Sequence, residues 1–198
     1  AKDSFIKQEI KDGKKFEKKT EIKDHKAAFK QVVQAILDKE YGLLSSIDEI
    51  NAVGHRVVHG GEKYSASVVI DKTVINDIEE CSDLAPLHNP PNIEGIKSAM
   101  ETFPNAIHTA TFDTSFHQTL PEYAYMYALP YELYEKFKIR RYGFHGTSHR
   151  YVMSKALDFC KRAKENTNLI TCHLGNGCSI TSIAAGRSID TSMGLTPL

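Results

Sequence analysis

Arg56 lies where its charge needs a partner. It interrupts the apolar segment GHRVVHGG, residues 54–61, which has the pattern of a strand that ends in two glycines. Burying an arginine without a partner is costly, and its planar guanidinium suits a carboxylate or a phosphoryl group. This segment alone therefore favours an internal salt bridge and an anion-binding site about equally.

Asp113 follows a second buried segment. The sequence NAIHTATFDTSF, residues 105–116, is typical of a buried strand that ends in a polar turn, and Asp113 stands at the end of the strand. Open α/β sheets carry their functional groups at the carboxyl ends of their strands. A functional carboxylate and an aspartate that only caps a turn both remain open.

Two glycine-rich segments indicate anion binding. In RRYGFHGTSH, residues 140–149, glycines flank Phe144 and His145 just before an expected helix, and the free N–H groups and dipole of a helix N-terminus favour anions. The turn HLGNG, residues 173–177, could bind a phosphate through its backbone amides. Asn-Gly turns more often only reverse the chain, so the second signal is weak.

Histidine and cysteine usage does not favour a metal site. Eight of the nine histidines fall between His55 and His173, but no HExxH, HxH or paired His/Cys spacing is present. Most single histidines are core or interface groups. The alternative, a histidine-rich metal-binding protein, would have to keep its metal when it is treated with a chelator. We expect the four cysteines, which show no CxxC spacing, to be reduced thiols in the core: Cys81, Cys160, Cys172 and Cys178.

Composition and charge limit the class of protein. The 198 residues include 25 basic and 25 acidic side chains, so the net charge is zero and neither nucleic acid nor an anionic membrane is an expected partner. No run of about 18 apolar residues and no signal-peptide core is present, which predicts a cytoplasmic protein. The chain begins without methionine and stops inside DTSMGLTPL, so we expect a piece of a longer protein.

Strand and helix patterns alternate, which predicts an α/β fold. Residues 4–10 and 14–22 alternate apolar and charged side chains as two strands joined by a turn at Asp12-Gly13. A helix is expected from the N-cap Asp24 to Gly42. Further helices are expected over 71–82, 91–102 and 147–163, the last capped by Thr147 or Ser148, with strands at 52–61, 105–116, 168–174 and 178–186, the last two as a hairpin.

Six segments together resemble the acetate kinase family. From about residue 54 to the end, the chain contains, in the family's order, HRVVHGGE, LAPLHNPPN, FDTSFH, YGFHGTSH, HLGNG and GRSIDTSMGLTPL. The resemblance implies the duplicated α/β fold of actin, Hsp70 and sugar kinases, which is ribonuclease H-like, with a cleft between two domains. It places an N-terminal domain at 1–115 and the start of a nucleotide-binding domain at 116–198.

The resemblance also implies a reaction and roles for individual residues. The family transfers the γ-phosphoryl group of ATP to acetate with Mg²⁺, giving acetyl phosphate and ADP, and its members are homodimers. Asp113, His145 and Arg56 match catalytic residues, and Arg56 also matches a substrate-binding one. The matching substrate pocket is Arg56, Val58, Leu87, Phe144 and Pro197, and the nucleotide phosphate loop is His173, Leu174, Gly175, Asn176 and Gly177. His88 matches a histidine near the site whose role stays open.

Several alternatives remain. The chain lacks the family's first strand and most of the second domain, and no metal ligand of the family falls in this segment, so residues 1–198 alone should show little kinase activity. A propionate kinase is one alternative. Propionate has one methylene more than acetate, and in an apolar pocket one methylene changes the discrimination between two substrates by only about 1 to 3 kcal/mol. A pyrophosphate-dependent relative and a non-catalytic nucleotide-binding module also stay open.

Since acetate is ionised at neutral pH, Asp113 has no proton to remove and should orient Mg²⁺ or water.

Overall fold

The structure, a computed structural model, describes residues 4–10, 13 and 15–197. Its contacts divide the chain into two compact units, one made of 1–54 and 93–109 and the other of 55–92 and 110–198. Three elements run from one unit into the other: β3 (Ala52–Val57), α3 (Asn89–Thr102) and β5 (Ile107–Phe112). The expected domain boundary between residues 115 and 116 comes from the family resemblance, and it stays a prediction.

The first unit begins with the expected pair of strands. β1 (Phe5–Glu9) pairs antiparallel with β2 (Lys15–Lys19), and alternate side chains of β1 are exposed. Asp12, half of the predicted turn, lies outside the described residues. The N-cap Asp24 is confirmed, because its carboxylate accepts a hydrogen bond from the N–H of Ala27 in α1 (His25–Ile36).

The end of α1 was predicted too late in the chain. The helix ends at Ile36 rather than at Gly42. The carboxylate of Asp38 accepts hydrogen bonds from the N–H groups of Glu40 and Tyr41 at 2.8 and 3.0 Å, which folds the chain into a turn. Such local side-chain bonds compete with helical ones, and an apolar pattern does not reveal them.

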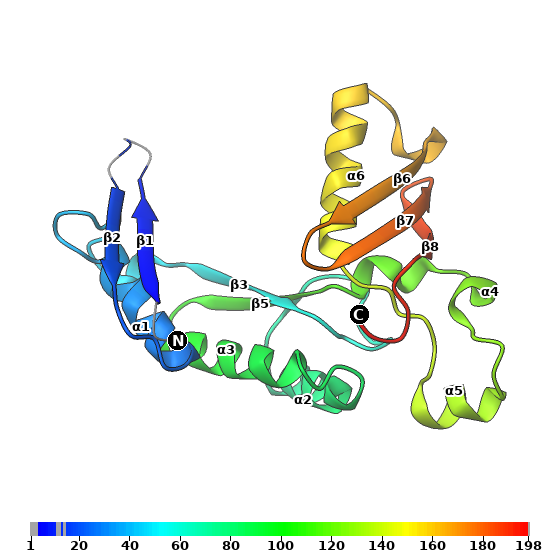
Figure 1. Ribbon diagram of the computed structural model, residues 1–198, viewed down its shortest axis with the longest axis horizontal. Coiled ribbons are helices and arrows are strands. Elements are labelled where there is room, and N and C mark those ends of the chain that lie inside the picture. The colour runs from blue at the N-terminus through cyan, green and yellow to red at the C-terminus, as the bar shows by residue number, and fades with distance from the viewer. Residues whose placement is uncertain (1–3, 11–12, 14, 198) are drawn as a thin grey trace. The chain divides into compact units, whose positions relative to one another are not determined.

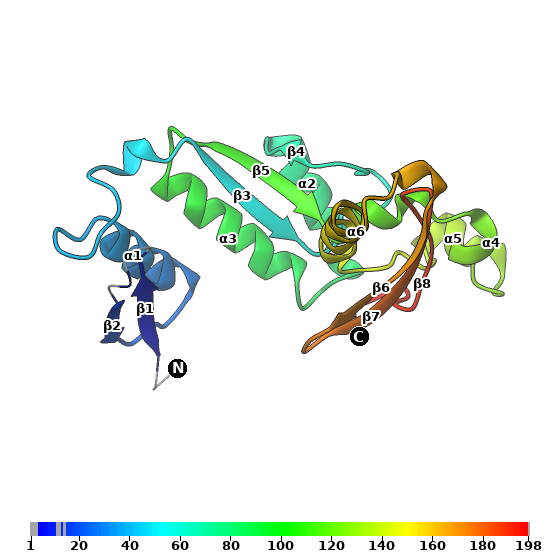
Figure 2. The ribbon, with the colours of Figure 1, turned by 90° about the horizontal axis from the view of Figure 1, so that it is seen from above.

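β3 and β5 bring Arg56 and Asp113 together. They lie side by side in a sheet of order β3-β5-β4, with β4 (Val68–Val69) at the edge (Figure 2). The N–H of Asp113 donates to the carbonyl of Val57 at 2.9 Å, so the aspartate stands beside the end of β3. In the sequence, η1 (Ile47–Glu49) precedes β3. After β4 come α2 (Lys72–Glu80), which Asp71 caps, and η2 (Cys81–Asp83).

The second sheet contains the expected hairpin. β6 (Asn168–Leu174) pairs antiparallel with β7 (Cys178–Ala184), and His173 lies opposite Ser179. β8 (Arg187–Thr191), which was not predicted, pairs with β7. The α6 helix (Gly146–Cys160) lies against this sheet (Figure 1), where Met153 and Leu157 pack with Ile183 and with Phe116 of η3 (Ser115–Thr119). The remaining elements are α4 (Glu122–Tyr125), α5 (Tyr131–Phe137) and η4 (Lys164–Asn166).

The start of α6 differs from the prediction. Neither Thr147 nor Ser148 caps the helix; the N-cap is His145, which has a φ of 58° and makes no side-chain capping bond. The N–H of Gly146 instead donates to the carbonyl of Asp113 at 2.9 Å. A Cβ at position 146 would stand 2.2 Å from that oxygen, so the close approach requires glycine. The helix start is thereby fixed to the end of β5.

Cysteine burial also differs from the prediction. All four cysteines are free thiols, but only Cys81 is buried. Cys172 and Cys178 lie on the sheet face opposite the one that contains Thr171 and Ser179, because side chains alternate along a strand. Cys160 is exposed at the last residue of α6. None of the helices in the described part of the chain is long and apolar enough to span a membrane.

Candidate active site

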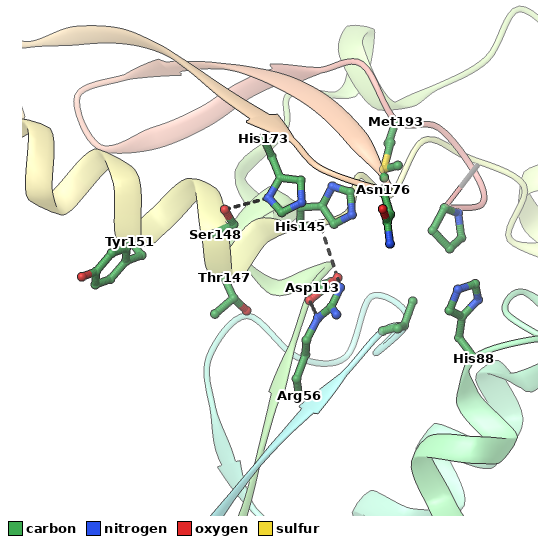
Figure 3. Close-up of a pocket in the computed structure, with 13 residues that line it drawn as sticks. Arg56, His88, Asp113, His145, Thr147, Ser148, Tyr151, His173, Asn176 and Met193 are labelled. Carbon is green, nitrogen blue, oxygen red and sulfur yellow. Dashed lines mark hydrogen bonds and ion pairs between the residues drawn. The ribbon is translucent and has the colours of Figure 1, made fainter. Parts of the chain in front are cut away.

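An open cavity of about 840 Å³ lies entirely within the second unit. Its walls come from β3, the end of β5, the start of α6, the β6–β7 turn and the segment after β8 (Figure 3). The residues that line it are Arg56, Val58, His88, Asp113, His145, Thr147, Ser148, Tyr151, His173, Asn176, Gly177, Met193 and Pro197.

Arg56 and Asp113 form a bidentate ion pair in this cavity. Nε of Arg56 donates to Oδ1 of Asp113 at 2.9 Å, and Nη2 donates to Oδ2 at 2.7 Å. The hydrogen bonds to Asp113 raise the pKa of Arg56. Asp113 is buried, whereas the Arg56 side chain is 61% exposed. Two of the five guanidinium N–H groups are used, so three remain for an anion in the cavity.

His145 stands next to this pair. Its backbone N–H donates to Oδ2 of Asp113 at 3.3 Å, and its ring stacks on that of His173 with centroids 4.0 Å apart. Burial, and then the neighbouring His173, lower the pKa of His145. The lowered pKa favours the uncharged ring, which can offer an anion one N–H group rather than a full charge.

The turn between β6 and β7 forms another wall. The N–H of Gly175 donates to the carbonyl of Gly177 at 3.0 Å, which closes the turn, and Asn176 lines the cavity. Nδ1 of His173 is hydrogen-bonded to the hydroxyl of Ser148 at 2.9 Å, which joins the turn to the first turn of α6. The guanidinium of Arg56, the imidazole rings and the amide of Asn176 together form a surface that suits an anion.

Some predicted site residues do not line the cavity. Phe144 is fully buried in a cluster with Val58, beneath the cavity wall, and Leu87 is 83% exposed. Leu174 and Gly175 are likewise not among the lining residues. The predicted roles of these four residues stay predictions, while the predicted polar residues, with Val58 and Pro197, do come together around one cavity.

The two arginines of RRYGFHGTSH are committed elsewhere. Arg140 is buried, donates to Glu62 at 2.6 Å and stacks on the ring of Tyr125. Arg141 forms an ion pair with Asp190 at 2.7 Å. Neither lines the cavity. The cation that faces the cavity from the described residues is therefore Arg56.

Sequence reasoning missed four lining residues: Thr147, Ser148, Tyr151 and Met193. Tyr151 follows Thr147 by four residues and Ser148 by three, which is the spacing that puts side chains on one side of the start of α6. That spacing was readable once a helix was expected, but Thr147 and Ser148 were interpreted as caps. Met193 belongs to the segment GRSIDTSMGLTPL, which supports the family resemblance but gives no chemical signal at this methionine.

The described residues do not by themselves form a metal site. Among residues 4–10, 13 and 15–197, no three His, Cys, Asp or Glu side chains are placed to hold a metal ion. Mg²⁺ prefers oxygen ligands, and the carboxylate that lines the cavity, that of Asp113, has both oxygens bound by Arg56. We therefore assign no step to a metal held by these residues.

Replacing Gly177 with alanine should disturb the His145 ring. A Cβ at position 177 would stand 2.9 Å from Cε1 and 3.0 Å from Nε2 of His145, and the ring is already held by its stack on His173. Misplacing a reacting group by about 1 Å can cost about 100-fold in rate, so we expect Gly177→Ala to lower turnover much more than Gly175→Ala. At position 175 the new Cβ would meet its first neighbour only at 3.6 Å. Steady-state kinetics of the two variants tests this, and equal losses would contradict it.

Three buried histidines should make the fold sensitive to acid. Burial lowers the pKa values of His59, His117 and His149 to about 4. Between about pH 6.5 and that value, the unfolded chain binds protons that the folded chain does not, so the free energy of unfolding should fall as the pH falls. Urea unfolding at about pH 7.5, 6 and 5 tests this. Carboxylates mostly titrate below this range, so a change within it reports on the histidines. A midpoint that does not change over this range would contradict the expectation.

Comparison with known families identifies the chain. Residues 1–198 match the family model described as the acetokinase family. The chain belongs to this family. It is 57% identical over 186 residues to an acetate kinase of Clostridium acetobutylicum, an alignment that covers 94% of this chain and 46% of that protein. It therefore spans about half the length of the curated relatives that it matches.

Solved structures agree with this assignment. An acetate kinase of Porphyromonas gingivalis is similar with a TM-score of 0.90 and 45% identity, covering 98% of this chain and 49% of that one. A propionate kinase of Francisella tularensis is similar with a TM-score of 0.84 and 47% identity, covering 92% and 46%. The expected actin/Hsp70/sugar-kinase-like α/β fold, of which this chain holds a part, is confirmed.

Proposed function

We propose that this protein transfers the γ-phosphoryl group of ATP to acetate, reversibly and in line. A carboxylate oxygen of acetate attacks the γ-phosphorus, the bond between that phosphorus and the β–γ bridging oxygen breaks, and acetyl phosphate and ADP are formed. The single observation that supports this most is the convergence of Arg56, His145 and the 173–177 turn on one cavity in an acetokinase-family chain.

Each residue has a role that its geometry suits. The three free N–H groups of Arg56 bind the acetate carboxylate and the transferring phosphoryl group, and the Asp113 carboxylate fixes the guanidinium from behind. A His145 N–H donates to an equatorial phosphoryl oxygen. Phosphoryl transfer depends mainly on positioning and on charge stabilisation, which these groups supply without covalent chemistry.

The 173–177 turn binds nucleotide phosphates in this proposal. His173 and Asn176 supply polar contacts, and the backbone of Gly177, which lines the cavity, allows a phosphate to approach closely. A cavity of about 840 Å³ is far larger than acetate requires, which is consistent with a nucleotide and an acid bound together. Mg²⁺ would neutralise phosphate charge, and Mg²⁺ sites commonly use substrate phosphates and water as ligands.

Propionate is the second candidate acceptor, since one of the similar structures is a propionate kinase. The apolar residues predicted to surround the methyl group discriminate weakly against one more methylene. A homodimer, a cytoplasmic location and the division into domains at 115/116 are part of the same proposal, as is ATP rather than pyrophosphate as the donor. A non-catalytic nucleotide-binding module is the alternative from a different class.

Hydroxylamine trapping tests the proposal. The full-length protein is supplied with acetate, propionate or butyrate, with and without ATP and Mg²⁺, and the acyl hydroxamate is measured. We expect a signal that requires both ATP and Mg²⁺ and is largest with acetate. If a folded full-length protein gave no signal with any acid, with ATP or pyrophosphate as donor, the kinase proposal would be wrong and the binding-module alternative would replace it.

A further inference from the structure

Behind His145 lies a buried chain of hydroxyl and imidazole groups. Nδ1 of His145 is 2.9 Å from the hydroxyl oxygen of Ser179, and that oxygen is 2.8 Å from Nε2 of His149. Nδ1 of His149 is in turn 2.8 Å from the hydroxyl oxygen of Thr171. All four residues are buried, and Ser179 is fully so. Of the four, only His145 lines the cavity.

Three elements bring these groups together. Ser179 and Thr171 lie on neighbouring strands β7 and β6, on the face that carries the buried side chains. His145 and His149 are the N-cap and the fourth residue of α6, so their side chains lie one turn apart. The chain of hydrogen bonds therefore connects the helix start to the sheet, directly behind the cavity wall.

The protons of this chain can be placed. Burial and the neighbouring histidines hold His149 neutral, with its pKa lowered to about 4, so it has one N–H and one accepting nitrogen. Among the described residues, His149 Nδ1 is the hydrogen-bond partner found for the Thr171 hydroxyl. A buried hydroxyl proton needs an acceptor, so Thr171 donates to Nδ1 of His149. The N–H of His149 is then on Nε2, and it donates to Ser179.

Ser179 has one proton left to donate, and the remaining partner is His145. A hydroxyl that accepts from His149 can donate to Nδ1 of His145, which must then be the unprotonated nitrogen of that ring. The His145 proton is thereby placed on Nε2. This atom stands 3.0 Å from the Cβ position of Gly177, a residue of the cavity wall.

We propose that Ser179 is a positioning residue: its hydroxyl donates to Nδ1 of His145 and holds the ring proton on Nε2, as a hydrogen-bond donor to the transferring phosphoryl group. The inference rests on the proposed function for the phosphoryl group, but the position of the proton does not. In the opposite arrangement a neutral His145 would present a lone pair to the cavity, which repels an anion. His149 and Thr171 fix the direction of the chain.

The charged groups around His145 are consistent with a neutral ring. Arg56 and His173 disfavour a positive charge there, and the Asp113 carboxylate, which favours one, is already paired with Arg56. A neutral imidazole offers a single N–H, so the tautomer decides whether the cavity receives a donor or an acceptor. Ser179 therefore controls the sign of the interaction that His145 makes.

The test combines kinetics with nitrogen NMR on the full-length protein. The variants are Ser179→Ala, Ser179→Thr, which keeps the hydroxyl, and Ser182→Ala, the same change on the same strand at a residue outside the cavity wall. We expect Ser179→Ala to lower kcat by about 10- to 100-fold, the range found when the hydrogen-bond partner of a metal-bound histidine is removed, with KM changed by less than about threefold. Ser179→Thr should restore most of kcat, and Ser182→Ala should leave it unchanged.

The NMR measurement reports the tautomer directly. With ¹⁵N-labelled histidine, and with His145→Gln to assign the signals, His145 in the wild type should carry its proton on Nε2, and Ser179→Ala should give a mixture of tautomers. A proton on Nδ1 in the wild type would overturn the proposal, as would full activity in a folded Ser179→Ala. If Ser179→Ala does not fold, the wild-type tautomer and the Ser179→Thr kinetics decide. If the wild type forms no acyl phosphate, the kinase proposal fails, while the tautomer still tests Ser179.

Discussion

Replacing Arg56 with alanine should lower kcat by about 1000-fold or more, because one arginine that stabilises the charge of a transferring phosphoryl group contributes on this scale. Arg56 is the cation that the described residues place in the cavity, and three of its N–H groups are free to bind the transferring phosphoryl group. Steady-state kinetics on the full-length protein measures the effect. Stability should change far less, because the Arg56 side chain is 61% exposed and water can reach Asp113 once it is removed.

Two further variants separate charge from geometry. Arg56→Lys keeps the positive charge, but one ammonium group cannot bind both oxygens of Asp113 and still present a planar fork to the anion. We expect its activity to stay close to that of Arg56→Ala. Arg150→Ala removes an exposed arginine of α6 outside this cavity and should leave turnover unchanged. An Arg56→Ala protein that retained a tenth or more of wild-type turnover would contradict the assignment.

Replacing Asp113 with asparagine should lower kcat by about 100-fold or more, since it loosens the group that stabilises the transition state. An amide oxygen can accept from one N–H of the guanidinium, but the amide NH₂ opposes the other, so the bidentate pair of 2.9 and 2.7 Å cannot be kept. The buried negative charge is also lost. Kinetics at several pH values is the measurement.

The pH profile distinguishes the roles of Asp113. Acetate is ionised at neutral pH, so the reaction toward acetyl phosphate requires no general base. We expect Asp113→Asn to lower the whole profile without changing its shape. If Asp113→Asn lost only the part of the pH–rate profile that depends on a deprotonated general base, and kept its rate at other pH values, Asp113 would be that base. Its proposed role in holding the Arg56 guanidinium would then be wrong.

Much of the site could be predicted because its residues stand at the ends of readable elements. Arg56 could be singled out because it is a charge inside an apolar strand, and Asp113 because it is a carboxylate at the end of one. Both alternatives for Arg56 prove relevant, because it forms an ion pair with a carboxylate and also faces a cavity. The hairpin of β6 and β7 follows from alternation around an Asn-Gly turn. These signals are local in the sequence.

The rest depends on contacts between distant residues. Ser179 lies 34 residues from His145 along the chain, and only the packing of α6 on the sheet makes them neighbours. The same alternation that predicts β6 and β7 does not say which face is buried, so Cys172 and Cys178 were placed in the core although they are exposed. The end of α1 depends on the Asp38 carboxylate, which competes with the helix after Ile36.

The most direct test of the central claim is ³¹P NMR of the full-length protein with ATP, Mg²⁺ and acetate labelled with ¹⁸O in its carboxylate. Attack by an acetate oxygen on the γ-phosphorus would place one ¹⁸O on phosphorus. We expect an acetyl phosphate signal with the isotope shift of one bridging ¹⁸O, and no such signal from Arg56→Ala. A folded wild-type protein that gave no acetyl phosphate, or acetyl phosphate without ¹⁸O bound to phosphorus, would contradict it.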